Sequence, residues 1–381
     1  MSPTPVTFTS PTAPAAYSWE ATDEEVSARY GVPIERIVRF DLNTSPAPPA
    51  FAARVLSEGR FETPLSEYAP SDYRRLIAAA AARYGVAADE IIVGAGADEI
   101  LDIIGKAFLP PGATAIVPTP SYAMYRVITE QRGAQVAAVP RLGATDGYAI
   151  DIPAVRAAAR TAALVWLCSP NNPTALPEPD GAIETLLDVI AVDALADGRG
   201  APIVVLDEAY AEFVDRSLVG LRERHANLII VRTASKAYGL AGLRVGFGIA
   251  RPEVIARLNP FRPPGSVSTV SVTIVTEALT DPTAAAANIE QVVRERDRLD
   301  SELTALGWSV GPSVTNFLLV DLGSAERAAA TGEGLLRHGL VPRTFPAGHP
   351  LATHLRLTVR APQENDRLIE AVRGLTTEAT A

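Results

Sequence analysis

Short apolar segments alternate with helical stretches along the middle of this 381-residue chain, and this pattern limits its fold more than any other feature. Strands separated by helices need crossover connections, which place successive strands parallel to one another in one sheet. Such sheets are covered by helices on both faces, so their strands are apolar throughout. We therefore predict an α/β fold with a mostly parallel sheet covered by helices. The expected strands are 91–93, 114–117, 135–139, 163–167, 203–206, 228–231 and 245–249.

The two ends of the chain differ from this pattern. A chain of 381 residues exceeds the ~100–200 residues of a usual single domain, so we expect more than one structural unit. Residues 1–50 predict an extended N-terminal arm with a short helix at 23–30, and residues 51–270 form the expected large domain. Residues 271–381 predict a smaller C-terminal α+β domain. The strands expected in that domain are 317–320 and 354–359.

Composition excludes several classes of protein. The chain is 48% hydrophobic and 20% charged, and its formal net charge of −10 argues against a nucleic-acid or acidic-membrane binder. No segment approaches the ~20 consecutive apolar residues of a membrane span, and residues 1–18 lack the basic and apolar regions of a signal peptide. Cys168 is the only cysteine, which excludes an intrachain disulfide and a cysteine-rich metal site. We expect a cytoplasmic protein that binds neither nucleic acid nor membranes.

Lysine is almost absent from the chain, whose 34 basic side chains are nearly all arginine. Lys106 lies near the end of a predicted helix, where cations are common. Lys236 instead follows the strand at 228–231, where an arginine would supply the same charge. Only the lysine amine can form a Schiff base, so Lys236 is a candidate for holding an aldehyde cofactor such as pyridoxal phosphate. The alternative is an ordinary surface lysine after a strand.

A phosphate group on such a cofactor has candidate partners in two segments. Residues 94–99 form a glycine turn between a strand and a helix, whose free backbone amides suit an anion. A tight turn without a ligand is an alternative, whereas a dinucleotide site is excluded because Glu99 replaces the third glycine of that motif. Near the lysine, Thr233 and Ser235 offer hydroxyl groups and Arg244 a guanidinium, all suited to a phosphate monoester.

Polar and aromatic residues also follow other predicted strands, at the edge where open α/β sheets bind ligands. Asp207 is suited to hold the proton of a pyridinium nitrogen, and Tyr210 to reach a phenolic oxygen of the same ring. As alternatives, Asp207 caps a helix or binds Mg²⁺, but the chain has no Gly-Lys-Ser/Thr phosphate loop. Asn172 can aim its amide into a cleft and Tyr122 can stack on a ring, with ordinary turns as the alternative for both segments.

Together these segments resemble the fold-type I pyridoxal-phosphate aminotransferases of classes I and II, and most closely the histidinol-phosphate aminotransferases. The resemblance runs from about residue 17 to residue 366 and is strongest in four motifs that keep the family's order and spacing. These are 94–99, 169–174, 207–210 and 235–244. The chain departs from the family where Ser18-Trp19-Glu20 replaces a Pro-Gly after the N-terminal tyrosine, in the arm that closes over the substrate.

For the site, the resemblance implies pyridoxal 5'-phosphate as the cofactor, with a Schiff base on Lys236 and a ring-nitrogen contact from Asp207. The other implied cofactor contacts are Asn172 and Tyr210 at the phenolic oxygen, Tyr122 on the ring face, and Ala95, Gly96, Ala97, Thr233, Ser235 and Arg244 at the phosphate. Tyr68 reaches the phosphate from a partner subunit in such enzymes, which implies a homodimer with shared active sites. The implied substrate contacts are Arg356 at a carboxylate, Arg343 and Tyr17 at a distal phosphate, and Asn43. The implied catalytic residues are Lys236, Asp207 and Tyr210.

The implied reaction is transamination of L-histidinol phosphate with 2-oxoglutarate, which gives imidazole acetol phosphate and L-glutamate in histidine biosynthesis. Three alternatives stay open: an aromatic amino-acid aminotransferase, a threonine-phosphate decarboxylase of the same fold, and a non-catalytic module that senses pyridoxal phosphate. We expect no metal, because the spacing of His349 and His354 fits no metal-binding motif.

Overall fold

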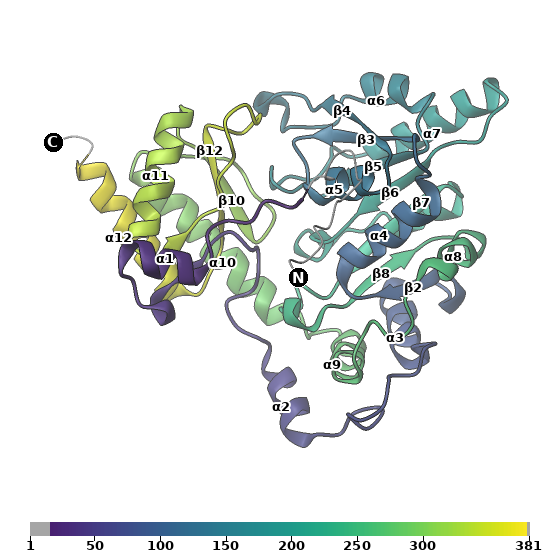
Figure 1. Ribbon diagram of the computed structural model, residues 1–381, viewed down its shortest axis with the longest axis horizontal. Coiled ribbons are helices and arrows are strands. Elements are labelled where there is room, and N and C mark those ends of the chain that lie inside the picture. Colours follow the sequence, from purple (N-terminus) through teal and green to yellow (C-terminus); the bar gives the residue numbers. More distant parts are fainter. Residues whose placement is uncertain (1–15, 379–381) are drawn as a thin grey trace, which may run out of the picture.

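A seven-stranded sheet forms the centre of the larger lobe in the computed structural model, which describes residues 16–378 (Figure 1). Its order is β2-β8-β7-β6-β5-β3-β4. Strand β8 is antiparallel to both of its neighbours, and the other pairs are parallel. The predicted mostly parallel sheet is therefore confirmed. Its strands are β2 (Ile91–Gly94), β3 (Thr114–Thr119), β4 (Gln135–Pro140), β5 (Leu164–Cys168), β6 (Ile203–Asp207), β7 (Leu228–Thr233) and β8 (Gly246–Ile249).

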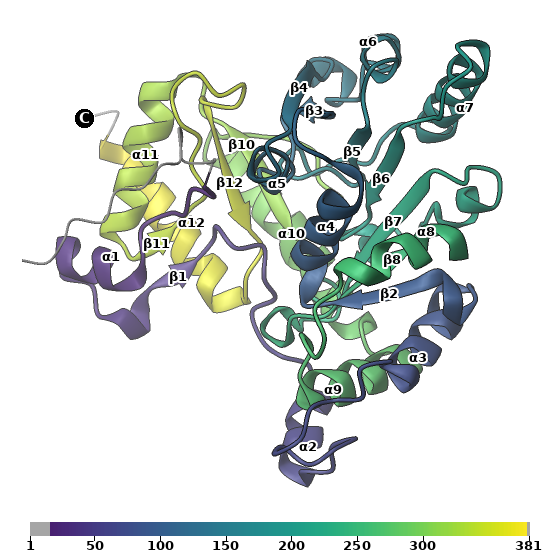
Figure 2. The same ribbon diagram turned by 45° about the vertical axis from the view of Figure 1, so that its right-hand side comes forward.

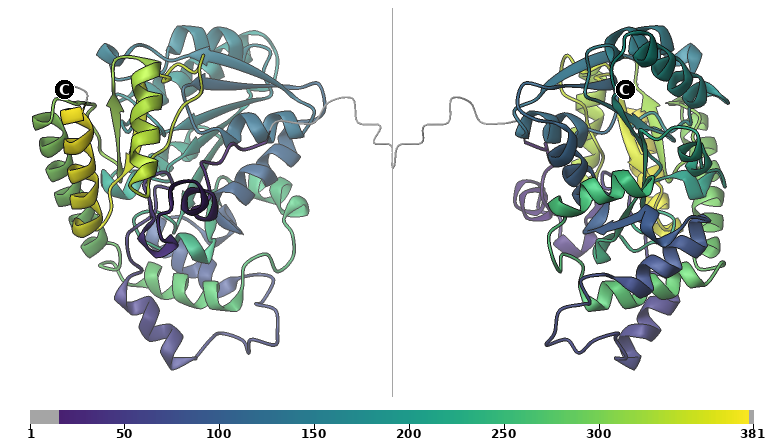
Figure 3. Two further views of the ribbon diagram at one scale, coloured as in Figure 1. Left: turned by 60° about the vertical axis from the view of Figure 1, so that its left-hand side comes forward. Right: turned by 90° about the vertical axis from the view of Figure 1, so that its right-hand side faces the viewer.

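Helices cover both faces of this sheet, as its apolar strands require. Side chains of β6 alternate between two clusters of buried residues, with Val205 on one face and Val204 and Leu206 on the other. The first face is covered by α4 (Gly96–Phe108), α5 (Met124–Gln131) and α8 (Pro252–Leu258). The cluster on the second face includes residues of α2 (Ala50–Glu58), α3 (Arg74–Tyr84), α6 (Ile152–Ala159), α7 (Ala182–Ala196) and α9 (Thr269–Thr280). Helix α2 lies at the end of the molecule opposite β4 (Figures 1 and 3).

The smaller lobe is built around a three-stranded antiparallel sheet with the order β12-β10-β9. Its strands are β9 (Ser309–Val310), β10 (Phe317–Asp321) and β12 (His354–Thr358). Its helices are α10 (Ala286–Ala305), α11 (Ala325–Arg337) and α12 (Pro362–Glu378), and the last two lie on the side away from the large sheet (Figures 1 and 2). Short 3-10 helices occur at Ile34–Arg36, Ala88–Glu90, Ala144–Asp146, Ala211–Phe213, Val219–Glu223, Ala241–Leu243 and Asn259–Phe261.

The N-terminal segment packs on this smaller lobe. Its helix begins with a capping box, in which the side chains of Thr22 and Glu25 each bond the other residue's backbone N–H. The strand that follows pairs in parallel with a strand of the smaller lobe, and Val38 and Phe40 are buried in the core of that lobe. The sequence did not predict this pairing, because two-residue strands carry no periodic pattern. These elements are α1 (Asp23–Tyr30), β1 (Val38–Arg39) and β11 (Leu340–Val341).

The carboxyl ends of β5, β6 and β7 meet at one edge of the large sheet. The three strands are parallel neighbours, and Asp207 at the end of β6 is level with Cys168 of β5 and Val231 of β7. The loops that follow these strands therefore emerge side by side. Open α/β sheets bind ligands at such an edge.

Candidate active site

A cleft of about 580 Å³ opens at this edge of the sheet, and both lobes contribute to its walls. It contains most of the residues that the sequence singled out. They are Tyr17, Asn43, Ala97, Tyr122, Asn172, Asp207, Tyr210, Thr233, Ser235, Lys236, Arg244, Arg343 and Arg356. Trp19, Asp41 and Asp98 also line the cleft and were not predicted to do so.

Three predicted site residues do not line the cleft. The Ala95 N–H donates to Glu99 Oε2 at 2.6 Å. Gly96 has a φ of 84°, a backbone conformation that favours glycine, and the end of the flexible Arg244 side chain lies over this position. Tyr68 is 89% exposed, outside the cleft of its own chain.

Lys236 lies just beyond the end of β7, next to the carboxyl end of β6. Its Nζ donates to the backbone oxygen of Asn43 at 3.1 Å and lies 5.8 Å from the ring centre of Tyr210. Burial and, to a lesser degree, the nearby charge of Arg356 lower the pKa of the amine to about 8. A lysine amine with a pKa near neutrality can act as a nucleophile and as a proton acceptor.

Asp207 is buried at the end of β6. Its carboxylate accepts hydrogen bonds from the Tyr125 hydroxyl at 2.8 Å and from the Ala209 N–H at 3.0 Å. Burial raises the pKa of Asp207 to about 6, while these two donors act in the opposite direction. A positively charged ring nitrogen placed next to Asp207 would stabilise the ionised form of this buried carboxylate. Tyr125 was not among the predicted site residues, although it lies only three residues after Tyr122, which was.

Asn43 connects the two lobes at the cleft. Its side-chain amide donates to the Tyr210 hydroxyl at 3.0 Å, and its backbone N–H donates to Thr358 Oγ1 at 2.9 Å. Its backbone oxygen accepts from Asn316 Nδ2 at 2.9 Å as well as from Lys236. Asn43 therefore orients Tyr210 and Lys236 in addition to lining the cleft. Asn316, which the sequence did not predict as a site residue, thus holds the Asn43 backbone in place.

Two arginines lie side by side in the wall formed by the smaller lobe. Arg343 and Arg356 form an antiparallel bridge with both backbone hydrogen bonds at 3.0 Å, so their side chains are cross-strand neighbours. The Arg356 guanidinium donates to Asn172 Oδ1 at 2.6 Å and to the Asp41 backbone oxygen. Its Nε is buried with no hydrogen-bond partner among the described residues. Burial lowers the pKa of Arg356, and Arg343 contributes in the same direction. Two adjacent guanidinium groups with a free donor favour a doubly charged anion.

The start of α4 and the segment after β7 form a second anion-binding corner. Ala95 provides no side-chain cap for α4, so backbone amides of its first turn are left for a ligand. The Thr233 and Ser235 hydroxyl groups lie 2.9 Å apart, and the half-exposed Arg244 guanidinium contacts Asp98 at 3.3 Å. These amide, hydroxyl and guanidinium donors fit a phosphate monoester.

Tyr122 lies beside this corner. Its hydroxyl donates to Asp98 Oδ1 at 3.0 Å, and its ring meets the ring of Tyr125 edge-on with 5.6 Å between the centres. Asp98 therefore links the Tyr122 hydroxyl to the Arg244 guanidinium. An aromatic ring fixed in this way offers its free face to a planar ligand.

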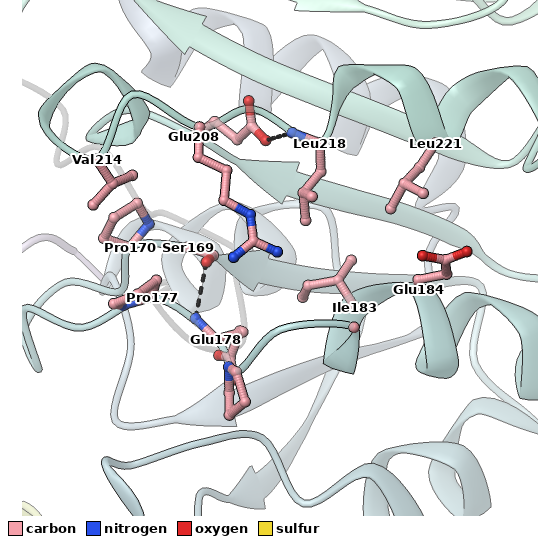
Figure 4. Close-up of a pocket in the computed structure, with 13 residues that line it drawn as sticks. Ser169, Pro170, Pro177, Glu178, Ile183, Glu184, Glu208, Val214, Leu218 and Leu221 are labelled. Atoms are coloured by element: carbon pink, nitrogen blue, oxygen red, sulfur yellow. Dashed lines mark hydrogen bonds between the residues drawn. The ribbon is translucent and has the colours of Figure 1, made fainter.

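A second cavity lies next to β5 and β6 but has only about 60 Å³ (Figure 4). Its polar groups already have partners: Ser169 Oγ accepts from the Glu178 N–H at 3.0 Å, and Glu208 Oε1 accepts from the Leu218 N–H at 2.6 Å. The Glu178 and Glu208 carboxylates also pair with Arg141 and Arg232. This cavity therefore has neither the volume nor the free donors of the larger cleft.

Within residues 16–378, no group of three or more His, Cys, Asp or Glu side chains is arranged to hold a metal ion. In the same part of the chain, no helix is both long and apolar enough to cross a membrane.

The cleft contains the groups that pyridoxal phosphate requires: an amine for its aldehyde, a carboxylate for its ring nitrogen and donors for its phosphate. These groups lie at the carboxyl edge of a mostly parallel sheet. Fold and site together define a pyridoxal-phosphate-dependent enzyme of the α/β class.

Comparison with known proteins identifies the family. The family described as aminotransferase class I and II matches residues 41–372. Histidinol-phosphate aminotransferases of Roseiflexus castenholzii and Symbiobacterium thermophilum are 35% and 36% identical to this chain, and the alignments cover 92% of it and 92% and 93% of those proteins. The crystal structure of the Sinorhizobium meliloti histidinol-phosphate aminotransferase in complex with pyridoxal-5'-phosphate matches with a TM-score of 0.82 and 26% identity, over 94% of this chain and 95% of that one.

The chain belongs to the class I and II aminotransferases. It is therefore a transaminase, and its cofactor is pyridoxal 5'-phosphate.

Proposed function

We propose that the enzyme transfers the amino group of L-histidinol phosphate to 2-oxoglutarate, which yields imidazole acetol phosphate and L-glutamate. The observation that carries this proposal is the pairing of Arg343 with Arg356 in the cleft. A phosphate monoester carries between one and two negative charges at pH 7, and its oxygens accept bidentate bonds from guanidinium groups. L-histidinol phosphate has this group and no carboxylate, so two adjacent arginines suit it well. The names of the relatives at 35% and 36% identity support the same substrate.

The same arginine pair accommodates the second substrate in this proposal. Both 2-oxoglutarate and L-glutamate carry a carboxylate next to the reacting carbon, where L-histidinol phosphate carries its phosphate ester. Arg356 is the group we assign to this carboxylate, because its Nε is buried without a partner and its other nitrogens are fixed by Asn172 and the Asp41 backbone. A guanidinium held in place loses little side-chain entropy when it binds a planar carboxylate.

Pyridoxal phosphate, when bound, supplies an aldehyde that holds the amino group and an electron-accepting ring that stabilises negative charge on the neighbouring carbon. We assign to Lys236 two tasks: it carries the cofactor, and once released it acts as the base that moves the proton of the substrate carbon. Its pKa of about 8 suits an amine that accepts and returns a proton near neutral pH. Asp207 holds the proton at the ring nitrogen, and Tyr125 keeps its carboxylate oriented.

The remaining cofactor contacts follow from the same assignment. We assign Asn172 and Tyr210 to the phenolic oxygen and Tyr122 to the ring face. Donors for the phosphate come from the start of α4 and from the segment after β7. They are the amides of Gly96 and Ala97, the hydroxyls of Thr233 and Ser235, and the guanidinium of Arg244.

We also propose that the enzyme is a homodimer with shared active sites. Tyr68 is 89% exposed and Leu65 is 69% exposed, and neither lines the cleft of its own chain. Such a pair of large exposed side chains in one segment suits contact with a second copy of the chain. In this proposal Tyr68 reaches the phosphate site of the partner.

The last two proposals concern the domains of the chain and its location in the cell. We propose a large domain over about residues 51–270 and a smaller C-terminal domain over residues 271–381. The pairing of β1 with β11 supports adding the end of the N-terminal arm to the smaller domain. A cytoplasmic location remains a prediction from the sequence.

The test of the proposed function is a comparison of amino donors with the purified, cofactor-loaded enzyme. Glutamate formation from 2-oxoglutarate is measured with L-histidinol phosphate, L-phenylalanine and O-phospho-L-threonine, and carbon dioxide release is followed with the last of these. We expect the highest kcat/KM with L-histidinol phosphate and no carbon dioxide release. A higher kcat/KM with L-phenylalanine, or release of carbon dioxide, would show that the substrate assignment is wrong.

A second candidate, an aromatic amino-acid aminotransferase, is favoured by one observation. Tyr17, Trp19 and Tyr122 together line the cleft, and the ring centres of Tyr17 and Tyr122 lie 6.5 Å apart. Such a wall suits any donor with a planar ring. The paired arginines favour the phosphorylated donor over this alternative, and the same comparison of donors decides between them.

A further inference from the structure

The N-terminal segment carries an indole at the cleft that the assigned roles leave unexplained. Trp19 lines the cleft and is 71% exposed, and its ring meets the ring of Tyr17 edge-on with 4.7 Å between the centres. The other tryptophans of the chain, Trp166 and Trp308, are buried in the cores of the two lobes. Trp19 is therefore the one tryptophan whose apolar ring is left largely exposed to water.

The backbone on both sides of Trp19 is fixed to the smaller lobe. Arg343 donates to the Ser18 backbone oxygen at 2.6 Å. The Glu20 carboxylate accepts from the Thr344 N–H at 2.8 Å and from the Thr344 hydroxyl at 3.0 Å. Two neighbours of Trp19 are thus tied to two consecutive residues of the smaller lobe. A ring presented on an anchored segment is preorganised, which reduces the entropy lost when a ligand packs against it.

Arg343 takes part both in holding the segment around Trp19 and in the arginine pair that we assign to the substrate anion. Glu20 Oε1 lies 3.5 Å from Arg343, whose guanidinium also lies 5.5 Å from the ring centre of Tyr17. Arg343 in turn is the cross-strand neighbour of Arg356. The indole therefore lies on a segment held by the same arginine that we assign to the substrate phosphate, so the position of the anion and the position of the aromatic wall are fixed relative to each other.

We propose that Trp19 is a specificity-determining residue, whose indole is the surface against which the ring of an imidazole-bearing or aromatic amino donor packs. This inference rests on the proposed function and adds to it the recognition of the donor's ring. Offset or edge-on packing of the substrate ring on the indole buries apolar surface that is otherwise exposed to water. L-Glutamate has no ring, so the same enzyme form can release glutamate without breaking this contact.

The experiment compares half-reaction rates of the cofactor-loaded wild-type enzyme with those of Trp19→Ala and Trp19→Phe. The donors are L-histidinol phosphate and L-phenylalanine, which carry a ring, and L-glutamate, which does not. We expect Trp19→Ala to lower kcat/KM about tenfold for the ring-bearing donors, the loss of roughly one aromatic contact, and to leave L-glutamate nearly unchanged. Trp19→Phe should recover most of the loss. Leu195→Ala, which truncates an 84% exposed side chain on α7, is the matched control and should change none of the rates.

The outcomes separate this inference from the proposed function. An equal loss for all three donors, or no loss for any, overturns the role of Trp19. If wild-type enzyme uses L-phenylalanine but not L-histidinol phosphate, the proposed function fails, and a loss confined to L-phenylalanine still supports the inference. An enzyme that accepts no ring-bearing donor overturns both.

Tryptophan emission gives a second readout that a merely structural role would not change. Because Trp166 and Trp308 are buried, the long-wavelength part of the emission comes from Trp19. We expect L-histidinol phosphate to shift the emission of the wild-type enzyme to shorter wavelength, L-glutamate to leave it unchanged, and Trp19→Phe to abolish the shift. A shift of the same size with L-glutamate contradicts the inference.

Discussion

At the residue scale, the protonation of the Lys236 amine is set by its surroundings. Burial lowers its pKa from 10.5 to about 8. Below that pH the amine is protonated and cannot attack an aldehyde, and above it the amine is free. We therefore expect the rate at which the apoenzyme takes up pyridoxal phosphate to rise with pH and to level off just above pH 8. Stopped-flow absorbance at a series of pH values measures this rate. A rate that keeps rising until pH 10 contradicts the lowered pKa.

The buried Asp207 carboxylate depends on the hydroxyl of Tyr125, which donates to it at 2.8 Å. Tyr125→Phe removes this donor, and a hydrogen bond to a charged group contributes about 1.5–3 kcal/mol, so we expect kcat to fall by about tenfold or more. The pKa of Asp207 should rise further, because burial then acts with one opposing donor fewer. The rate of the L-glutamate half-reaction as a function of pH measures both effects.

The matched control for this substitution is Tyr84→Phe. The Tyr84 hydroxyl is buried and has no hydrogen-bond partner among the described residues. Its removal should therefore leave kcat unchanged and stability equal or slightly higher. If the two variants lose the same activity, the Tyr125 hydroxyl has no special role at Asp207.

Some of these residue contacts could not be predicted from the sequence. Asn316 bonds the backbone of Asn43 across 273 residues of chain, and no local pattern reports such a contact. Lys236, by contrast, could be singled out because the chain is nearly free of lysine and because only this side chain forms an imine. A catalytic role that only one residue type can fill can be predicted from the sequence. Hydrogen-bond partners that are distant in the sequence cannot, because the tertiary fold decides them.

At the scale of elements, β8 and the start of α4 approach each other so closely that only glycine fits between them. A Cβ on Gly246 would lie 2.3 Å from the Gly96 carbonyl carbon and 2.5 Å from the Ala97 nitrogen. Gly246→Ala forces one of these backbones to move, at a cost of about 1–3 kcal/mol by analogy with overpacked cores. We expect a lower free energy of unfolding and weaker binding of pyridoxal phosphate, measured by denaturant titration and by cofactor titration.

Gly220→Ala provides the comparison for this variant. No atom lies within 4 Å of a Cβ at Gly220, and the residue is exposed. Stability and cofactor affinity should both stay close to the wild-type values. Retention of full cofactor affinity in Gly246→Ala would mean that the close approach does not shape the phosphate site.

The elements of the large sheet could be predicted because each strand is a short apolar run bounded by helices. Strands such as β5, which is buried along its whole length, have no polar face that would obscure the pattern. β1, β9 and β11 have two residues each and escaped prediction. Their pairing is decided by the packing of the smaller lobe, which a local pattern does not contain.

At the scale of the whole molecule, the proposed homodimer makes a prediction about mixed subunits. Lys236→Ala inactivates the site of its own chain, and Tyr68→Phe removes a hydroxyl that we assign to the partner's site. A dimer with one subunit of each kind has one site with both groups intact. We therefore expect activity above that of either variant alone when the two are unfolded together and refolded as a mixture, measured as glutamate formation. A mixture no more active than its separate components contradicts the shared site.

The proposed function is a transamination in which this cleft carries out both half-reactions, with L-histidinol phosphate as the donor. Its most direct test is the visible absorbance of the cofactor-loaded enzyme during stepwise addition of the two substrates. We predict that L-histidinol phosphate bleaches the band of the cofactor held by Lys236 and that 2-oxoglutarate restores it. A band that L-glutamate bleaches but L-histidinol phosphate leaves unchanged would contradict the claim, because the cofactor site would then be active toward a different donor.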